Sequence, residues 1–309
     1  MKPLVISVVG PTAVGKSKLG VEIAKRFGGE VISGDSMQIY KSMDIGTAKV
    51  TEQEMQGIPH HLVDIKEPDE SFSVAEFQDK VQNLIRTISS QGNLPVIVGG
   101  TGLYIQATLY NFNFSEQKRD EQVIKRLEKE ACEYGMEALY RRLQSVDPEQ
   151  AKKVHPNNER RVLRALEVYE TTGKVMSDYQ KQQSNESPFR PVIIGLEMER
   201  EELYNRINRR VDHMVEEGLI AEVRGLYNKG YEHTQAMKAI GYKEFLPYFN
   251  GEYSLDRAVE LLKRNSRRYA KRQYTYFRNK MNVHWYSISE QGYEEKFETI
   301  LNDLAGMMK

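Results

Sequence analysis

Residues 10–17 read Gly-Pro-Thr-Ala-Val-Gly-Lys-Ser and match the phosphate-loop pattern G-x-x-x-x-G-K-[ST]. The loop follows an apolar run of strand length, Leu4–Val9, and precedes Lys18–Phe27, which has helical periodicity. Loop N–H groups, the helix N-terminus and the Lys16 ammonium form an anion cradle in such an arrangement. We therefore predict that the loop binds a di- or triphosphate and that Ser17 can hold Mg²⁺. The predicted phosphate-binding residues are Gly10, Pro11, Thr12, Ala13, Val14, Gly15, Lys16 and Ser17.

Strands and helices alternate in the sequence beyond this loop. The run Glu30–Ser33 predicts a second strand, Phe72–Ser89 an amphipathic helix, and Leu94–Val98 a buried strand. This alternation is typical of a parallel sheet covered by helices on both faces. The predicted fold class is therefore α/β, a P-loop NTPase-like parallel sheet flanked by helices.

Three loops are predicted to meet at one edge of this sheet, because each follows a strand and ligands gather at the C-terminal ends of parallel strands. They are Gly10–Ser17, Asp35-Ser36 and Gly99–Thr101. Asp35 is either a turn or Mg²⁺-associated residue, or a general base opposite the phosphate cradle. Thr101 either caps the helix that follows it or contacts an acceptor through its hydroxyl.

Residues 113–187 are charged, helical and almost free of strand signals. The predicted helices are Asp120–Glu133, Met136–Gln144, Pro148–Val154 and Asn158–Thr172, followed by a polar linker, Gln180–Pro188. The strand Val192–Leu196 then returns the chain to the sheet. We predict a core of residues 1–112 and 188–309 with an all-helical insertion domain at 113–187. The later core elements are predicted as helices Glu201–Tyr227 and Leu255–Arg278 and strand Val283–Tyr286.

The second of these long helices carries a strong positive charge. Residues 257–280 hold nine Lys or Arg side chains and one acidic residue, Glu260. Arg264, Arg268 and Arg272 share one helical face, and aromatic residues are interleaved with them. Basic side chains contact phosphates and aromatic rings stack on bases, so this face is predicted to bind RNA.

A further group of arginines, Arg206, Arg209 and Arg210, lies on the first long helix. One of them can reach a bound diphosphate, or they can pair with Glu216 or Glu217 on the surface. Spacing alone leaves both arrangements open.

Composition excludes several classes of protein. Lys plus Arg and Asp plus Glu are both 44, so a polyanion partner must be recognised by local charge. Cys132 is the only cysteine, which excludes an internal disulfide and a cysteine-cluster zinc site. No apolar run reaches the roughly 18 residues of a membrane span. Met1-Lys2-Pro3 leads directly into the first strand, so we expect no signal peptide and a cytoplasmic location. As a separate expectation, we take the protein to be a monomer.

Taken together, the sequence resembles the bacterial tRNA dimethylallyltransferases, also called tRNA isopentenyltransferases. Seven blocks in order carry the resemblance: GPTAVGKS at 10–17, GDSMQIYKSMDIGTAK at 34–49, PHHLVDI at 59–65, VIVGGTGLY at 96–104, HPNNERRVLRALEVY at 155–169, AMKAIGYKE at 236–244 and RRYAKRQYTYFR at 267–278. The resemblance implies transfer of a dimethylallyl group from dimethylallyl diphosphate to N6 of adenosine at tRNA position 37, beside the anticodon. The C-terminal zinc finger of the eukaryotic branch is absent from this sequence.

Residue roles follow from the resemblance where the motifs match. The loop would hold the diphosphate of the prenyl donor, with Lys16, Mg²⁺ at Ser17 and Arg210 stabilising the leaving group. Asp35 would take the proton from the adenine amine, which Thr101 would orient. The tRNA-binding residues that the resemblance implies are Asp35, Ser36, Met37, Gln38, Thr101, Arg160, Arg161, Val162, Leu163 and Arg164.

Three other functions remain open at the level of the sequence. An isopentenyltransferase acting on free AMP or ATP shares the loop and the chemistry, but it needs neither the helical insertion nor the basic helix. A P-loop kinase would use ATP, but the strand at 96–98 ends in Gly-Gly-Thr without the usual carboxylate. A non-catalytic RNA-binding module would not need Asp35 opposite the cradle.

Overall fold

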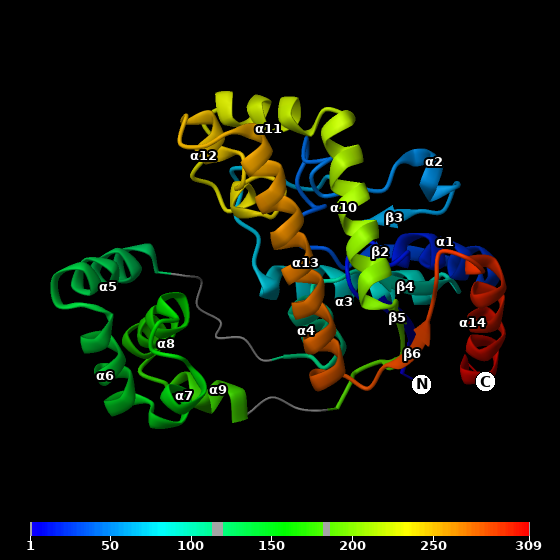
Figure 1. Ribbon diagram of the computed structural model, residues 1–309. Coiled ribbons are helices and arrows are strands. Elements are labelled where there is room, and N and C mark those ends of the chain that lie inside the picture. Colours follow the sequence, from blue (N-terminus) through cyan, green and yellow to red (C-terminus); the bar gives the residue numbers. More distant parts are fainter. Residues whose placement is uncertain (1, 113–119, 182–185, 309) are drawn as a thin grey trace. The chain divides into compact units, whose positions relative to one another are not determined.

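The structure is a computed structural model that describes residues 2–112, 120–181 and 186–308. Its contacts divide the chain into two compact units, a core unit of residues up to 110 and from 187 onward, and a second unit of residues 111–186. The boundary predicted at residue 113 and the middle of the predicted linker, residues 182–185, lie outside the described residues. Figure 1 shows the elements of both units.

A six-stranded sheet forms the centre of the core unit, and every strand pairing in it is parallel. The strand order is β3-β2-β4-β1-β5-β6. The strands are β1 (Leu4–Val9), β2 (Gly29–Ser33), β3 (His60–His61), β4 (Leu94–Val98), β5 (Arg190–Glu197) and β6 (His284–Ser287). The predicted α/β class is confirmed. Because β1 lies between β4 and β5 and β2 borders β4, the loops after β1, β2 and β4 emerge next to one another.

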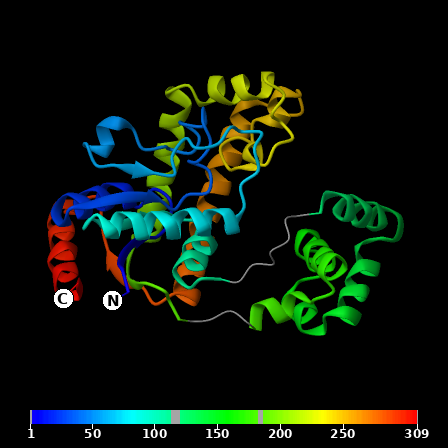
Figure 2. The ribbon, with the colours of Figure 1, turned by 180° about the vertical axis from the view of Figure 1, so that it is seen from behind.

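Helices cover both faces of the sheet, as predicted. They are α1 (Lys16–Phe27), α2 (Glu52–Met55), α3 (Val74–Ser90), α4 (Gly102–Leu109), α10 (Arg200–Glu216), α11 (Leu219–Asn228), α12 (Leu246–Phe249), α13 (Leu255–Lys280) and α14 (Tyr293–Met308). Successive strand residues point to opposite faces, so Val5 and Val9 pack with α3, whereas Ile6 and Val8 pack with α1 and α14. Figure 2 shows α3 lying across its face of the sheet.

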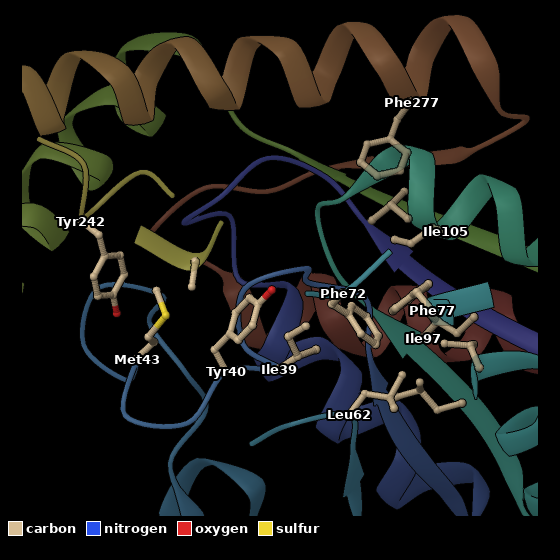
Figure 3. Packing of buried hydrophobic residues seen from close by; sticks show 14 of the residues in the cluster. Ile39, Tyr40, Met43, Leu62, Phe72, Phe77, Ile97, Ile105, Tyr242 and Phe277 are labelled. Carbon is tan, nitrogen blue, oxygen red and sulfur yellow. The ribbon is translucent and has the colours of Figure 1, made fainter. Parts of the chain in front are cut away.

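Helix α13 contributes to the same core as α3 and α4. Phe277 is fully buried and projects from α13 toward Ile105 of α4, and Tyr242 lies beside Met43 (Figure 3). Helices α10 and α13 also pack against each other (Figure 1). The two long helices that carry the predicted arginines, α10 and α13, therefore contribute side chains to the hydrophobic core.

The sequence prediction of one continuous helix at 201–227 is wrong. Gly218, with φ of 105°, separates α10 from α11. This left-handed conformation is open to glycine at little cost. The change of direction lets Leu219 and Val223 of α11 join the hydrophobic core beside α3 and α13.

In the second unit, the described ordered elements are helical, as predicted: α5 (Glu121–Tyr134), α6 (Met136–Val146), α7 (Pro148–Lys153), α8 (Glu159–Thr172) and α9 (Met176–Lys181). Leu127, Leu143 and Leu166 form part of its own core. The start of the predicted linker, residues 180–181, belongs instead to α9. Buried Asp147 explains this, because its carboxylate caps α7 and also accepts from Ser177 N at 2.9 Å in α9. Across the described ranges, no helix combines the length and apolarity that crossing a membrane requires.

Candidate active site

The phosphate loop presents hydrogen-bond donors and a partly buried lysine, Lys16. Gly15 occupies the N-cap of α1 and provides no capping side chain, so the first-turn N–H groups are left to a ligand. Lys16 Nζ folds back and donates to Pro11 O at 2.6 Å, while Ser17 is exposed. Burial, with the nearby Arg210 guanidinium, lowers the pKa of Lys16 to about 7. The positive charge on Lys16 is therefore unfavourable until an anion binds beside it, as expected of an anion-binding site.

Arg210 is the arginine of α10 that faces this loop. Its Nη1 lies 3.4 Å from Thr12 Oγ1, and burial lowers the pKa of its guanidinium. Arg206 and Arg209 instead pair with Glu290. The acidic residues considered as alternative partners, Glu216 and Glu217, lie beside His213. Of the two arrangements left open by spacing, the geometry favours Arg210 at the phosphate site.

Two glycines bring the loops after β2 and β4 together. A Cβ added to Gly99 would lie 2.3 Å from the main chain of Gly34, so the loop after β4 tolerates no side chain at this position. Gly34 N also donates to Val98 O at 2.7 Å, and Thr101 N to Gly34 O at 3.3 Å. This close approach places Asp35 beside Thr101.

Asp35 occupies a turn and also faces the partly buried Lys16 and Arg210. Its Oδ1 accepts from Met37 N at 2.8 Å, which is the turn role considered from the sequence. Burial raises the pKa of its carboxyl, although Lys16, Arg210 and the turn N–H groups act in the opposite direction. A carboxylate with a raised pKa is a better proton acceptor than an exposed one. The turn therefore fixes the orientation of Asp35 and is compatible with a role as general base.

Thr101 lies at the N-cap of α4, but its side chain does not cap the helix. The hydroxyl oxygen accepts from Ser36 N at 3.2 Å and lies 3.4 Å from Ser36 Oγ. The Tyr269 side chain of α13 lies near Thr101. Thr101 thus lies between helix α13 and the loop that contains Asp35 and Ser36.

In the loop after Asp35, the polar side chain of Gln38 is bonded to other residues near it in the sequence. Gln38 Nε2 donates to Ala48 O at 3.1 Å and lies 3.4 Å from Thr47 O, and its Oε1 lies 3.2 Å from Ser33 Oγ. Met37 packs partly buried against the core. These contacts indicate that Gln38, expected from the resemblance to contact tRNA, also shapes the loop.

The basic face of α13 is partly committed to ion pairs. Lys263 pairs with Asp212 and Arg278 with Glu197. Arg268 and Arg272 are exposed, and Arg272 lies over the Tyr269 ring at 5.6 Å from its centroid. Arg264 is half-buried. The exposed part of the predicted RNA-binding face is thus concentrated on the turns next to Tyr269.

The predicted segment 160–164 lies on α8 of the second unit. Arg160 and Arg161 are exposed there. Arg164 Nη1 donates to Glu167 at 2.7 Å. Leu163 is half-buried and Val162 is fully buried in the core of this unit. The buried Val162 side chain packs in the core of this unit, so the exposed side chains that the predicted segment offers to tRNA are those of Arg160 and Arg161.

Residues 38–280 match the family model described as IPP transferase. The chain belongs to the IPP transferase family. A tRNA dimethylallyltransferase of Oceanobacillus iheyensis is 60% identical over 309 residues, which is 100% of this chain and 99% of that protein. The resemblance inferred from the seven blocks is confirmed, as is the prediction of a prenyl-transferring enzyme at the level of this family.

Solved structures agree with this assignment. The tRNA isopentenylpyrophosphate transferase of Bacillus halodurans is 52% identical, with a TM-score of 0.76 over 99% of this chain and 96% of that one. A eukaryotic dimethylallyltransferase described as acting on tRNA is 33% identical, with a TM-score of 0.84 over 98% of this chain and 80% of that one.

For this IPP transferase family member, the sequence interpretation assigned no specific role to two residues at the site. Tyr269 was grouped with aromatics available for stacking, but its hydroxyl is buried, and burial raises its pKa to about 12. Gln273 was assigned nothing, yet it contacts the phosphate loop. The available signal was a glutamine among the inward-facing positions of α13, between Ala270 and Phe277.

Proposed function

We propose that this protein transfers a dimethylallyl group from dimethylallyl diphosphate to N6 of adenosine 37 of tRNA, next to the anticodon, and releases diphosphate. The observation that carries the proposal is that the partly buried cations Lys16 and Arg210 face one partly buried carboxylate, Asp35. A diphosphate leaving group needs the cations and an amine nucleophile needs the base. The names of the relatives support tRNA as the acceptor.

The cation side acts on the leaving group. The N–H groups at the start of α1, Lys16 and Arg210 would hold the diphosphate and stabilise the charge that develops as the allylic C–O bond breaks. Mg²⁺, when bound, would neutralise part of that charge. The described residues contain no cluster of three His, Cys, Asp or Glu side chains for a metal, so Ser17, the diphosphate oxygens and water are its candidate ligands.

The carboxylate side acts on the nucleophile. As the bond from N6 to the allylic carbon forms, the amine becomes acidic, and Asp35 accepts its proton. Thr101, held against Ser36, would orient the amine. Because the adenine must reach a buried donor, the base is expected to leave the stack of the anticodon loop. The segments 35–38 and 160–164 and the arginines of α13 would hold the tRNA, with the protein acting as a cytoplasmic monomer.

The test is incubation of purified protein with Mg²⁺, radiolabelled dimethylallyl diphosphate and an unmodified tRNA that has adenosine at position 37. A matched tRNA with guanosine at that position and free AMP are the two comparison acceptors. We expect label only in the first tRNA. Label in AMP would assign the protein to the free-nucleotide enzymes. Hydrolysis of ATP without any label transfer would assign it to the kinases.

A further inference from the structure

Gln273 connects two loops of the site through one buried amide. Its side chain lies on α13 in a residue that is 5% exposed. Oε1 accepts from the main-chain N–H of Thr12 at 2.8 Å, and Nε2 donates to Gly100 O at 3.0 Å. Thr12 belongs to the phosphate loop and Gly100 to the loop that ends at Thr101. The oxygen and the nitrogen of the amide are therefore both satisfied, each by a different loop of the site.

The surroundings of the amide leave little freedom. A Cβ added to Gly100 would lie 2.0 Å from Gln273 Nε2, so the amide occupies the space that a side chain at position 100 would need. One helical turn earlier, the Tyr269 side chain lies near the side chains of Thr101 and Gln273. Two successive inward positions of α13 thus hold the loops that carry the phosphate cradle and Thr101.

Thr12 is held from two directions. Gln273 takes its N–H, and Arg210 of α10 approaches its hydroxyl. Because the N–H of Thr12 is used by Gln273, it is not free to bind phosphate in this arrangement. The contact of Gln273 therefore acts on the position of the loop and not on the anion.

We propose that Gln273 is a positioning residue that sets the spacing between the diphosphate cradle and the Asp35–Thr101 side of the site, and links both to helix α13. Its effect on transfer rests on the proposed function. A displacement of about 1 Å between reacting groups can cost on the order of 100-fold in rate. The exposed Arg268 and Arg272 lie on the same helical segment, so tRNA bound there would act on the spacing directly.

The first variant is Gln273→Leu, which keeps a similar volume and removes both hydrogen bonds. We expect single-turnover transfer at saturating substrates to fall about 10- to 100-fold, since misplaced groups lose rate. The Kd values for inorganic diphosphate and tRNA should change less than about threefold, because Gln273 contacts neither ligand. The control is Asn265→Leu on the same helix, which removes a different side-chain amide bond, that to Glu244. Equal rates in both variants would overturn the proposal.

Gln273→Glu provides a pH readout that a purely structural role would not produce. A carboxylate can accept from Thr12 N but repels Gly100 O, whereas the protonated acid can accept and donate as the amide does. The ratio of the variant rate to the wild-type rate should therefore rise as the pH is lowered. A ratio that does not change between about pH 8 and pH 5.5 would contradict the proposed pair of bonds.

Gly100→Ala tests the same link from the other loop. The added methyl group would displace the Gln273 amide, so this variant should reproduce the rate loss of Gln273→Leu. The double variant should lose little more than either single one, because the same link is removed only once. If the rate loss of the double variant equals the product of the two single rate losses, the two residues act independently.

A final measurement does not depend on transfer. Hydrogen exchange is followed with and without inorganic diphosphate and Mg²⁺. In the wild type, diphosphate should slow the exchange of amides in residues 10–17 and in residues 99–104. In Gln273→Leu, diphosphate should slow exchange only in residues 10–17. An unchanged response of 99–104 in the variant would overturn the link. Absence of any label transfer by the wild type would instead overturn the proposed function and leave this result to decide the link.

Discussion

The two loops that form the site are stabilised in opposite ways. The phosphate loop, residues 10–17, leaves the start of α1 without a capping side chain and places Lys16 against a carbonyl group without a described ion pair. The following loop, residues 35–49, satisfies its polar groups internally through Gln38 and Lys49. The comparison indicates that the first loop keeps the donors at the start of α1 for an anion, while the second is already shaped before a substrate arrives.

Glu222 of α11 adds a contact from outside the second loop. Its carboxylate accepts from the N–H groups of Asp44 at 2.9 Å, Ile45 at 2.8 Å and Gly46 at 3.0 Å. The Tyr242 hydroxyl donates to the same carboxylate at 2.6 Å. Protein carboxylates of this kind occupy the position that a ligand anion takes in a phosphate loop. In the second loop the cluster of main-chain N–H groups, called a nest, is filled by the Glu222 carboxylate. In the phosphate loop the N–H groups at the start of α1 are left for a ligand.

The largest expected effect comes from Asp35→Asn, which keeps the acceptor for the Met37 N–H but removes the base. Transfer should fall about 10²- to 10⁴-fold, the usual contribution of general acid–base catalysis. In the wild type the rate should fall as the pH drops through the raised pKa of Asp35, because only the ionised carboxylate accepts the proton. Single-turnover rates across pH provide the measurement. Full activity in Asp35→Asn would show that Asp35 is not the general base.

The second effect concerns stability. Glu222→Gln replaces one acceptor oxygen by an NH₂ group facing backbone donors, so the free energy of unfolding of the core unit should fall by about 2 kcal/mol. Urea unfolding followed by fluorescence of the single tryptophan, Trp285 on β6, reports on this unit. The matched control is Glu216→Gln, an exposed position expected to change stability by less than about 0.5 kcal/mol. Equal stability of the two variants would show that the filled nest is not needed.

The third effect is a proton taken up with the anion. Since burial lowers the pKa of Lys16 to about 7, free Lys16 loses its proton as the pH rises above that value, and a bound diphosphate must restore it. Affinity should therefore fall with rising pH, by up to about tenfold per unit. Lys16→Arg keeps its charge and should lack this component. Calorimetry at about pH 8 in buffers of different ionisation enthalpy should show about one more proton taken up by the wild type. Equal uptake by both proteins would contradict the lowered pKa.

The smallest effect is expected on the outer surface of α13. Replacing Arg268 and Arg272 by Gln should weaken tRNA binding several-fold and reduce the slope of log Kd against log salt by about 1 for each lost phosphate contact. Arg257→Gln is the control, since that exposed residue pairs with Glu260 at the far end of the helix. Filter binding at several salt concentrations measures the slopes. An unchanged slope would mean that this face is only solvated.

Much of the fold was predictable because its signals are local and periodic. Buried parallel strands appear as short apolar runs, and α3 shows its apolar face at helical spacing. Prediction failed where a single residue changes the chain direction, as at Gly218, or where a buried cap lies far away in sequence, as with Asp147 and Ser177. Such contacts leave no periodic trace.

The sequence by itself determined the phosphate loop, the alternation of strands and helices, and the charge of α13, because spacing along the chain specifies each of them. Tertiary structure alone decided that Arg210 and not Arg206 or Arg209 faces the loop, and that Gln273 reaches Thr12. These partners are separated by most of the chain. Only the strand order, with β1 between β4 and β5, brings them to the same edge of the sheet.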